Sequence, residues 1–579
     1  MKKIKESNFL KAVIMTLSLA LCVSLLLKYI PNTIVKIVVN VVVFGLLVAF
    51  LVFKKKDKLI LIAVPAFVAF VLSYFISTSV IQMIIAILWI ALLLIGLFVN
   101  KLSGPFKATM IFVTLTMLLT WVLPVTSYSY SLNSTGKLSE VGMFDFLSYG
   151  NVALSYFGNI SFYIISIGVL YGVLYNIGAY RNLLNKIAEK SKNHKKLVLI
   201  LIVVLLSIIT AVCGTSMGFW FIIPFIVSLV LLMGYNKFTA ALVGIGPMLV
   251  GLMGNLFSST YISSDYSLEM QNGMGIVNSI LNTSQNINTA FQPAQVRFFA
   301  IRLGVLLLGI AALIVNIVLA SRKEEKKLSD EDKSLIPEVV ENKSKVWPII
   351  VVLDLLLIVC ALSMTSWSSV FNVKVFEKLT TNMNENFGLV FSGVKAFERW
   401  TVNELSSVMI LASAVLALIY KVNLSDWLTN ALKGIKKALK PALIVVFIYI
   451  VLVIVSYNPI VLTIVKPLIG KHLNVFTMGL TAFVTSIFNI DMYYSASSVL
   501  PYVTSMITDA SSSVYPGIAV IWQVMFGLVA AVAPTSIVLV PVLSYMDISF
   551  KDWVKHNWLF LAGLVFISAL TLIVLLLMI

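Results

Sequence analysis

Two polar interruptions of long apolar stretches, one in each half of the chain, carry the residues best suited to bind a small solute. A broken helix is tolerated in lipid only where its freed backbone groups are buried in protein or line a wet cavity. Hydroxyl and carbonyl oxygens suit Na⁺, and half-helix N-termini suit an anionic group. Interruptions at corresponding positions of two halves therefore predict the substrate site of a secondary transporter. The candidate residues are Gly214, Thr215, Ser216, Pro534, Thr535 and Ser536.

Further polar residues lie close to these interruptions in the sequence. Asn255 and Ser258 end a glycine-rich span, and we expect Asn255 to line a cavity because a buried amide needs hydrogen-bond partners. Asn489 and Asp491 belong to the second interrupted stretch. A carboxylate at membrane depth is a functional-site hypothesis, because it can couple H⁺ or Na⁺ or pair with a substrate amine. The alternative places Asp491 near the outer interface of the membrane.

Structural explanations compete with the functional ones for two of these features. The glycines before Asn255 are explained more simply by close helix packing. For the Pro-Thr-Ser interruption, the sequence leaves open whether the hydroxyls bind an ion or bond to their own backbone beside a proline kink.

The residues that enzymes and metal sites require do not form a recognisable pattern. His194, His472 and His556 flank helices without metal-ligand spacing, and the three cysteines lie in apolar stretches. The sequence shows neither a paired-carboxylate site at the membrane surface nor a phosphate-binding Gly-Lys loop. We therefore predict no enzyme activity, no metal and no cofactor beyond a Na⁺ or H⁺ coupling ion. A membrane-embedded enzyme and a transport-inactive scaffold are the alternatives from other classes.

The composition determines the fold class that must position these residues. The chain has 579 residues, of which 60% are hydrophobic and 11% charged, whereas soluble proteins average roughly 25% charged. This predicts an all-α polytopic membrane protein. The net charge of +18 comes from lysines in short loops, which is typical of cytoplasmic loops rather than of nucleic-acid binding. We expect a multi-pass protein of the bacterial plasma (inner) membrane with a cytoplasmic N-terminus.

Hydropathy and loop charge predict about 13 transmembrane helices plus two re-entrant hairpins in an inverted repeat. The first hairpin is expected near residue 214 and the second near residue 489. In the first half a span is expected over 161–180, and in the second half an interfacial helix over 426–440 before a span over 441–457. The predicted regions are extra N-terminal spans over 1–104, a first transporter half over 105–320, a solvated, charged cytoplasmic linker over 321–345 and a second half over 346–579.

Four sequence stretches resemble a known family. They are the Thr-Trp-Val-Leu-Pro exit at 120–124, the glycine-spaced helix at 168–178, the first interruption at 214–220, and the stretch from Gly527 through the Pro-Thr-Ser interruption to Trp553. Together they resemble the YfcC-like group of the C4-dicarboxylate carrier families, within the wider ion transporter superfamily. The resemblance covers 105–579, whereas residues 1–100 have no usual counterpart in the group.

The resemblance implies a scaffold domain, a transport domain with two hairpins, a homodimer and an elevator-like step, with residues 214–216 and 534–536 lining the site. One departure is that residues 219–221 read Phe-Trp-Phe, where the group carries acidic residues. We therefore expect a secondary active transporter of a C4-dicarboxylate or an amino acid, driven by an ion gradient or by exchange. A Na⁺/H⁺-type cation antiporter with Asp491 as the titrating group is the alternative.

Overall fold

The structure is a computed structural model that describes most of the chain beyond residue 103. The described residues are 104–123, 127–131, 134–137, 141–257, 295–320, 330–338, 344–365, 367, 371–391, 393–470, 473–488, 492–506 and 514–578. They belong to the second of two compact units into which the chain divides, Ser103–Ile579. Of the N-terminal spans predicted over 1–104, residues 1–103 lie outside the described residues.

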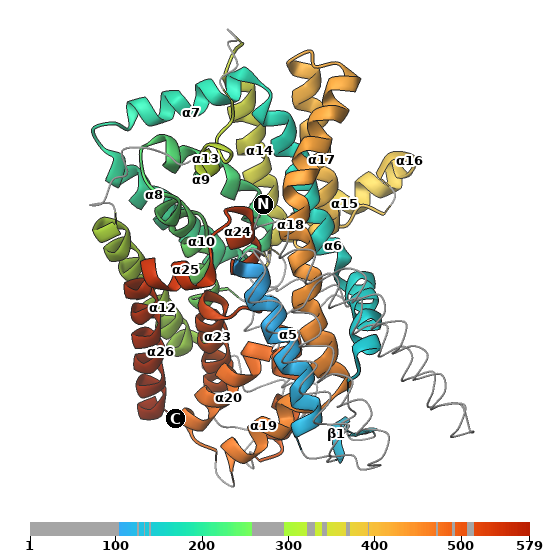
Figure 1. Cartoon of the computed structure of the whole chain (residues 1–579), viewed down its shortest axis with the longest axis vertical. Coiled ribbons are helices and arrows are strands. Elements are labelled where there is room, and N and C mark those ends of the chain that lie inside the picture. Colours follow the sequence, from blue (N-terminus) through green and yellow to red (C-terminus); the bar gives the residue numbers. More distant parts are fainter. Residues whose placement is uncertain are drawn as a thin grey trace, which may run out of the picture. The chain divides into compact units, whose positions relative to one another are not determined.

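Long apolar helices dominate this unit (Figure 1). Within the described ranges, nine are long and apolar enough to cross a membrane, which confirms a multi-pass membrane protein. The count of about 13 spans stays a prediction. The nine helices are α5 (Gly104–Val122), α6 (Met143–Tyr175), α8 (Lys195–Cys213), α12 (Gln295–Ala320), α14 (Trp347–Met364), α17 (Val402–Ile419), α18 (Leu424–Tyr457), α23 (Val514–Val532) and α26 (Trp558–Met578).

Shorter helices and one β-hairpin complete the described residues, so the all-α class is confirmed apart from that hairpin. Strands β1 (Ser127–Ser131) and β2 (Ser134–Lys137) pair antiparallel, with Ser127 opposite Lys137. The shorter helices are α7 (Gly178–Lys190), η1 (Met217–Ile222), α9 (Ile223–Leu232), α10 (Lys237–Met253), α13 (Asp330–Lys333), α15 (Val375–Asn386), α16 (Gly388–Phe391), α19 (Ile460–Ile469), α20 (Val475–Phe488), α21 (Met492–Ser497), α22 (Leu500–Thr504), α24 (Leu539–Tyr545) and α25 (Phe550–His556).

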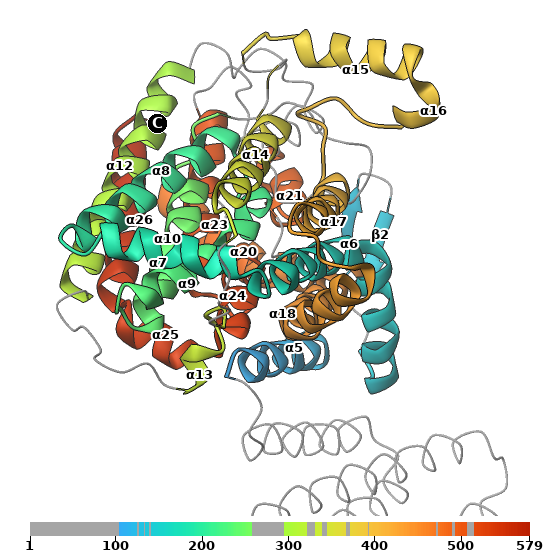
Figure 2. The same cartoon turned by 90° about the horizontal axis from the view of Figure 1, so that it is seen from above.

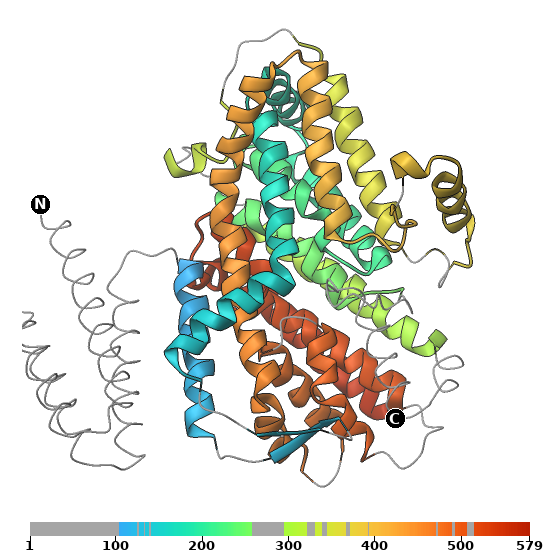
Figure 3. The same cartoon turned by 90° about the vertical axis from the view of Figure 1, so that its right-hand side faces the viewer.

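Helices α6 and α18 form the centre of one helix group, which also contains α5, α14 and α17 (Figures 2 and 3). The two helices touch through glycines, because a Cβ on Gly434 of α18 would overlap the carbonyl oxygen of Gly168 on α6. Small residues allow such close backbone approach in membrane helices. Ser161 of α6 adds a hydrogen bond of 2.9 Å from its hydroxyl to the carbonyl of Ala442. We call α5, α6, α14, α17 and α18 the α6–α18 group.

Helix α10 is the centre of a second group, which contains α8, α9, α12, α23 and α26 (Figure 2). Its glycines mark where neighbours approach closely. A Cβ on Gly251 would lie 2.6 Å from Cβ of Thr210 on α8, and one on Gly254 would lie 2.7 Å from Cα of Leu306 on α12. This supports the packing explanation for the glycines of this span. We call these helices the α10 group.

The two interrupted stretches begin at opposite ends of the unit. Helix α8 follows α7, which lies at the upper end in Figure 1, and α20 follows α19, which lies at the lower end. Opposite entry is what an inverted repeat requires. The re-entrant depth of both hairpins stays a prediction.

Two boundaries differ from the sequence-based prediction. The interfacial helix expected over 426–440 and the span expected over 441–457 are one helix, α18, with Pro441 inside it. Proline removes one backbone hydrogen bond, but it bends rather than ends a helix that packed neighbours support. Helix α6 also begins at Met143, well before the span predicted to start at residue 161.

The charged linker between the two halves is partly buried, although the sequence predicted a solvated segment. Leu335 is 4% exposed and Ile336 8% exposed. The runs of charged residues before them suggested solvation, but the short apolar sequence Leu-Ile-Pro at 335–337 inserts between the two helix groups.

A capping box at the start of α17 allows a test of the local structure. Glu404 accepts hydrogen bonds from the Thr401 backbone N–H at 2.7 Å and from its hydroxyl at 2.6 Å. We expect Thr401→Ala to lower the free energy of unfolding by about 1 kcal/mol, because the N-terminal turn loses its cap. Thermal unfolding in detergent measures this. Exposed Ser407→Ala in the same helix should change stability by less than about 0.5 kcal/mol, and an equal effect of both substitutions would contradict the assignment.

Candidate functional site

The first interruption begins where α8 ends. Gly214 has φ of +77°, a left-handed conformation that favours glycine, and its N–H bonds to the Thr210 carbonyl. Thr215 and Ser216 follow in a short non-helical link before η1, and both side chains are buried. The predicted tip is therefore a buried helix break.

The end of α10 meets this tip. The Asn255 side-chain amide donates to the Gly214 carbonyl at 3.4 Å, and the Leu256 N–H donates to the Ala211 carbonyl at 2.9 Å. Asn255 is fully buried, as its predicted role requires. The structure thus brings Asn255 together with the 214–216 tip.

The Pro-Thr-Ser interruption of the second half lies between α23 and α24. The Thr535 hydroxyl donates to the Ile487 carbonyl of α20 at 2.7 Å, and the Ser536 hydroxyl accepts from the Leu539 N–H at 3.1 Å. The Pro534 carbonyl accepts from the Thr109 hydroxyl at 3.0 Å. The hydroxyls of Thr535 and Ser536 therefore have different hydrogen-bond partners. Ser536 caps its own helix, as the structural explanation predicted, whereas Thr535 ties this break to α20.

Serines and a tryptophan that the sequence analysis did not single out lie beside Thr535. The Ser486 and Ser495 hydroxyls are 3.3 Å apart, and the Trp522 indole donates to Ser495 at 3.0 Å. Ser486, Thr535 and Ser536 line one small cavity. The sequence shows one serine at each end of this interrupted stretch. Serine is too common in membrane helices for that position alone to predict a site residue.

Three predicted residues lie outside the described part of the chain, namely Ser258, Asn489 and Asp491. Their assignment stays a prediction. Thr535 holds the carbonyl of Ile487, which precedes Asn489 by two positions in the sequence.

Gln523 of α23 joins the two halves. Its amide Nε2 donates to the carbonyl of Leu252 in the last turn of α10, and the side chain is fully buried. The last carbonyls of a helix have no partner within the helix, so a side chain from the other half satisfies one here. The sequence showed Gln523 as a lone amide in an apolar helix, but not which helix it would reach.

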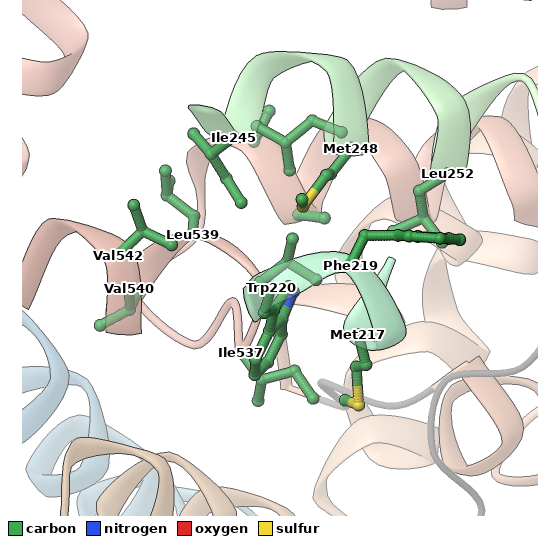
Figure 4. Close-up of a cluster of buried hydrophobic side chains, with 14 of the residues drawn as sticks. Met217, Phe219, Trp220, Ile245, Met248, Leu252, Ile537, Leu539, Val540 and Val542 are labelled. Carbon is green, nitrogen blue, oxygen red and sulfur yellow. The ribbon is translucent and has the colours of Figure 1, made fainter. Parts of the chain in front are cut away.

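Apolar contacts also join the segments that follow the two breaks. Figure 4 shows Met217 and Trp220 of η1, Met248 and Leu252 of α10, and Ile537 in one cluster of buried apolar side chains. The segment after the first break is therefore packed against the segment after the second.

Several polar atoms in this junction are buried without a hydrogen-bond partner among the described residues. They are the Ser216 hydroxyl, the Trp220 indole nitrogen and the Gln523 Oε1. An unsatisfied buried polar atom costs about 1–3 kcal/mol. Such atoms concentrated where two broken helices meet are therefore suited to bind a polar solute, an ion or water.

Arg302 supplies a buried positive charge at the same helix end. It lies in the membrane-spanning helix α12, is 5% exposed, and donates to the carbonyls of Phe298 at 3.3 Å and Asn255 at 3.4 Å. No carboxylate in the described ranges pairs with it. A charge at membrane depth is expensive and marks a functional site by default. The sequence did not indicate Arg302 as a site residue, because Arg302 lies in the next span and not in an interruption.

A cavity of about 460 Å³ opens beside the junction, between the two helix groups. It is bounded by α6 and α18 on one side and by η1, α9 and α24 on the other, with Trp220 in its wall. Its size is in the range of small-molecule sites. Within the described residues, no group of three or more His, Cys, Asp or Glu side chains could hold a metal ion.

Comparisons with known proteins give one family match and several structural relatives. The model of the C4-dicarboxylate anaerobic carrier family matches residues 81–577. The YdaH transporter of Alcanivorax borkumensis has a TM-score of 0.37 and 12% identity, covering 81% of this chain and 98% of that one. Neisseria gonorrhoeae MtrF, from a class of antimetabolite efflux pumps, has a TM-score of 0.35 and 13% identity, covering 81% and 95%. No curated protein matches the sequence.

Proposed function

The chain belongs to the C4-dicarboxylate anaerobic carrier family, and from this membership we propose that it is a secondary active transporter of a small organic anion, with a C4-dicarboxylate as the first candidate. One observation supports the anionic substrate most directly. Arg302 and Gln523 both donate to the carbonyl end of α10, beside the first break. A buried guanidinium and an amide are groups that bind carboxylates.

The chemistry at this site is binding and release without covalent change. Arg302 would provide the counter-charge, and Gln523 with Ser216 would orient the substrate through hydrogen bonds. Burial strengthens each of these interactions, because electrostatic attraction grows as the local dielectric falls. A substrate that neutralises Arg302 would also lower the cost of moving the site through the membrane.

Coupling to Na⁺ or H⁺, or exchange of one solute for another, would provide the driving force. The oxygens of the second break, including Thr535, would provide ligands for a cation such as Na⁺. The α10 group would move against the α6–α18 group in an elevator-like step. The division of the unit into two helix groups around the break region supports this proposal.

Ligand-dependent thermal stability tests the proposed function. We expect succinate at 100 times its Kd to stabilise the detergent-purified protein by about 2.7 kcal/mol, because only the folded state binds it. The melting midpoint is measured with succinate, glutamate and a neutral amino acid, each with and without Na⁺. Uptake of radiolabelled succinate by proteoliposomes is the functional counterpart.

The pattern of responses distinguishes the candidate substrates. A shift of the melting midpoint with glutamate alone would identify an acidic amino acid, and not a C4-dicarboxylate, as the substrate. A response to Na⁺ or pH without any solute response would contradict the proposal and favour the cation antiporter, which was the alternative prediction from the sequence.

A further inference from the structure

The part of the linker that lines the cavity is held by side chains from both helix groups. We call residues 334–337 the strap. Tyr175 of α6 and Ser228 of α9 both donate their hydroxyls to the Leu335 carbonyl, at 3.0 and 2.7 Å. Lys437 of α18 donates to the Ser334 carbonyl at 2.6 Å. Helices from opposite groups therefore bind the same short segment.

Further contacts hold the strap from either side. The Arg181 guanidinium of α7 donates to the Pro337 carbonyl at 3.0 Å, and Lys237 of α10 lies 4.0 Å from the Asp332 carboxylate just before the strap. Burial lowers the pKa of Arg181, but guanidinium stays protonated in proteins. Release of the strap would therefore free the charged groups of Lys437 and Arg181, which then need another acceptor.

The cavity under the strap carries an excess of positive charge. Lys333, Lys433 and Lys437 line it, against one carboxylate, Glu338. Lys437 is half-buried, and its ammonium lies 4.9 Å from the ring centre of Tyr175. Within the described part of the chain, no carboxylate forms an ion pair with Lys437. Among the described residues, its charge is met by the Ser334 carbonyl and by the rings of Tyr175 and Tyr545.

The rest of the cavity wall is mostly apolar, with one further donor. The Trp220 indole N–H, 5% exposed, has no hydrogen-bond partner among the described residues. A carboxylate held by Lys437 with an apolar body against Ile164 and Val542 would use these groups. The cavity is at the end of the unit that carries the basic segments, which the lysine distribution predicts to be cytoplasmic.

We propose that this cavity is a second binding site for an organic carboxylate, reached from the cytoplasmic side, with Lys437 as its counter-charge and the strap as its cover. The proposal rests on the proposed function for the identity of the solute. The carboxylate replaces the Ser334 carbonyl as the partner of Lys437, which releases one of the bonds that hold the strap.

Charge-selective labelling of a cysteine in the cavity tests the proposal without requiring transport. The cysteine is introduced as Val542→Cys after Cys22, Cys213 and Cys360 are replaced by alanine. Inside-out vesicles are treated with methanethiosulfonate reagents that carry either a sulfonate or a trimethylammonium group. We expect the anionic reagent to react faster, and Lys437→Gln to lower the anionic-to-cationic rate ratio by about 10-fold.

Lys440→Gln is the matched control, because Lys440 lies on the same helix but pairs with Asp547 at 2.8 Å outside the cavity. It should leave the ratio unchanged, as should Lys437→Arg. A ratio rather than a rate is used because it cancels changes in exposure between variants. An equal effect of Lys437→Gln and Lys440→Gln overturns the role of Lys437.

Protection and strap release complete the test. Succinate or glutamate at millimolar concentration should slow labelling, and Lys437→Gln should abolish this protection. Tyr175→Phe combined with Ser228→Ala should accelerate both reagents equally, because the strap is held less firmly. Protection by neither anion overturns the site, and unchanged rates in the double variant overturn the cover. Loss of succinate uptake with charge-selective labelling intact would count against the proposed function alone.

Discussion

Gln523→Leu is expected to weaken succinate binding by about 10- to 100-fold, because a hydrogen bond to a charged group contributes about 1.5–3 kcal/mol. Leucine has a similar volume but has no amide N–H, so it can donate neither to the Leu252 carbonyl nor to a substrate carboxylate. Transport should fall in parallel, since the same side chain joins α23 of one half to α10 of the other. The dissociation constant is measured by equilibrium binding in detergent, and uptake is measured in proteoliposomes.

Asn316→Leu is the control for the loss of a buried amide. Asn316 is a buried amide of α12 whose Nδ2 donates to Asn557 at 3.2 Å, away from both helix breaks. The Asn316→Leu substitution should lower the melting midpoint. It should leave the Kd for succinate within twofold of the parent value, a margin of about 0.4 kcal/mol. If both variants lose binding equally, Gln523 acts through general stability and not through the site.

Arg302→Gln is expected to raise the Kd for succinate by about 100-fold or more, because loss of one partner of a buried charge pair costs about 2–5 kcal/mol. Glutamine retains a donor for the Asn255 carbonyl, so the local hydrogen bond to the end of α10 can survive. Arg302→Lys keeps the charge but not the planar guanidinium, and it should recover part of the affinity.

The size of the effect should depend on the charge of the solute. A dianion should lose more affinity than a monoanion, and binding of a neutral amino acid should be unaffected. Arg399→Gln is the control, because Arg399 pairs with Glu377 at 2.8 Å in a partly exposed region. If the Arg302→Gln variant has the same Kd for succinate as the parent protein, the guanidinium only caps the helix, and another residue binds the substrate carboxylate.

Much of the architecture follows from local sequence. Apolar runs of membrane-spanning length predict helices wherever they occur, because an unpaired backbone group in lipid is costly. Sequence-based prediction was wrong for segments whose structure does not depend on the length of an apolar run. Pro441 was interpreted as a boundary but lies inside α18, and the linker sequence Leu-Ile-Pro was interpreted as solvated but is buried between helix groups.

The candidate site was predictable to a smaller extent. The breaks at Gly214 and at Pro534 are local events, since glycine at positive φ and proline without an N–H end regular helices in any context. Which atoms gather around those breaks depends on contacts between distant segments. Thr535 reaches α20, and Gln523 reaches α10, across separations in sequence that no local pattern encodes.

Composition and the length of the apolar runs are enough to establish that this chain is a polytopic helical membrane protein with polar interruptions in each half, because they decide whether each segment requires lipid or water. Only the tertiary structure brought Arg302 and Gln523 to the end of α10, and only it placed the strap over the cavity beside Lys437. The physical reason is that a buried charge or amide is tolerated wherever it finds a partner. The neighbouring helix supplies that partner, and the tertiary structure determines which helix is the neighbour.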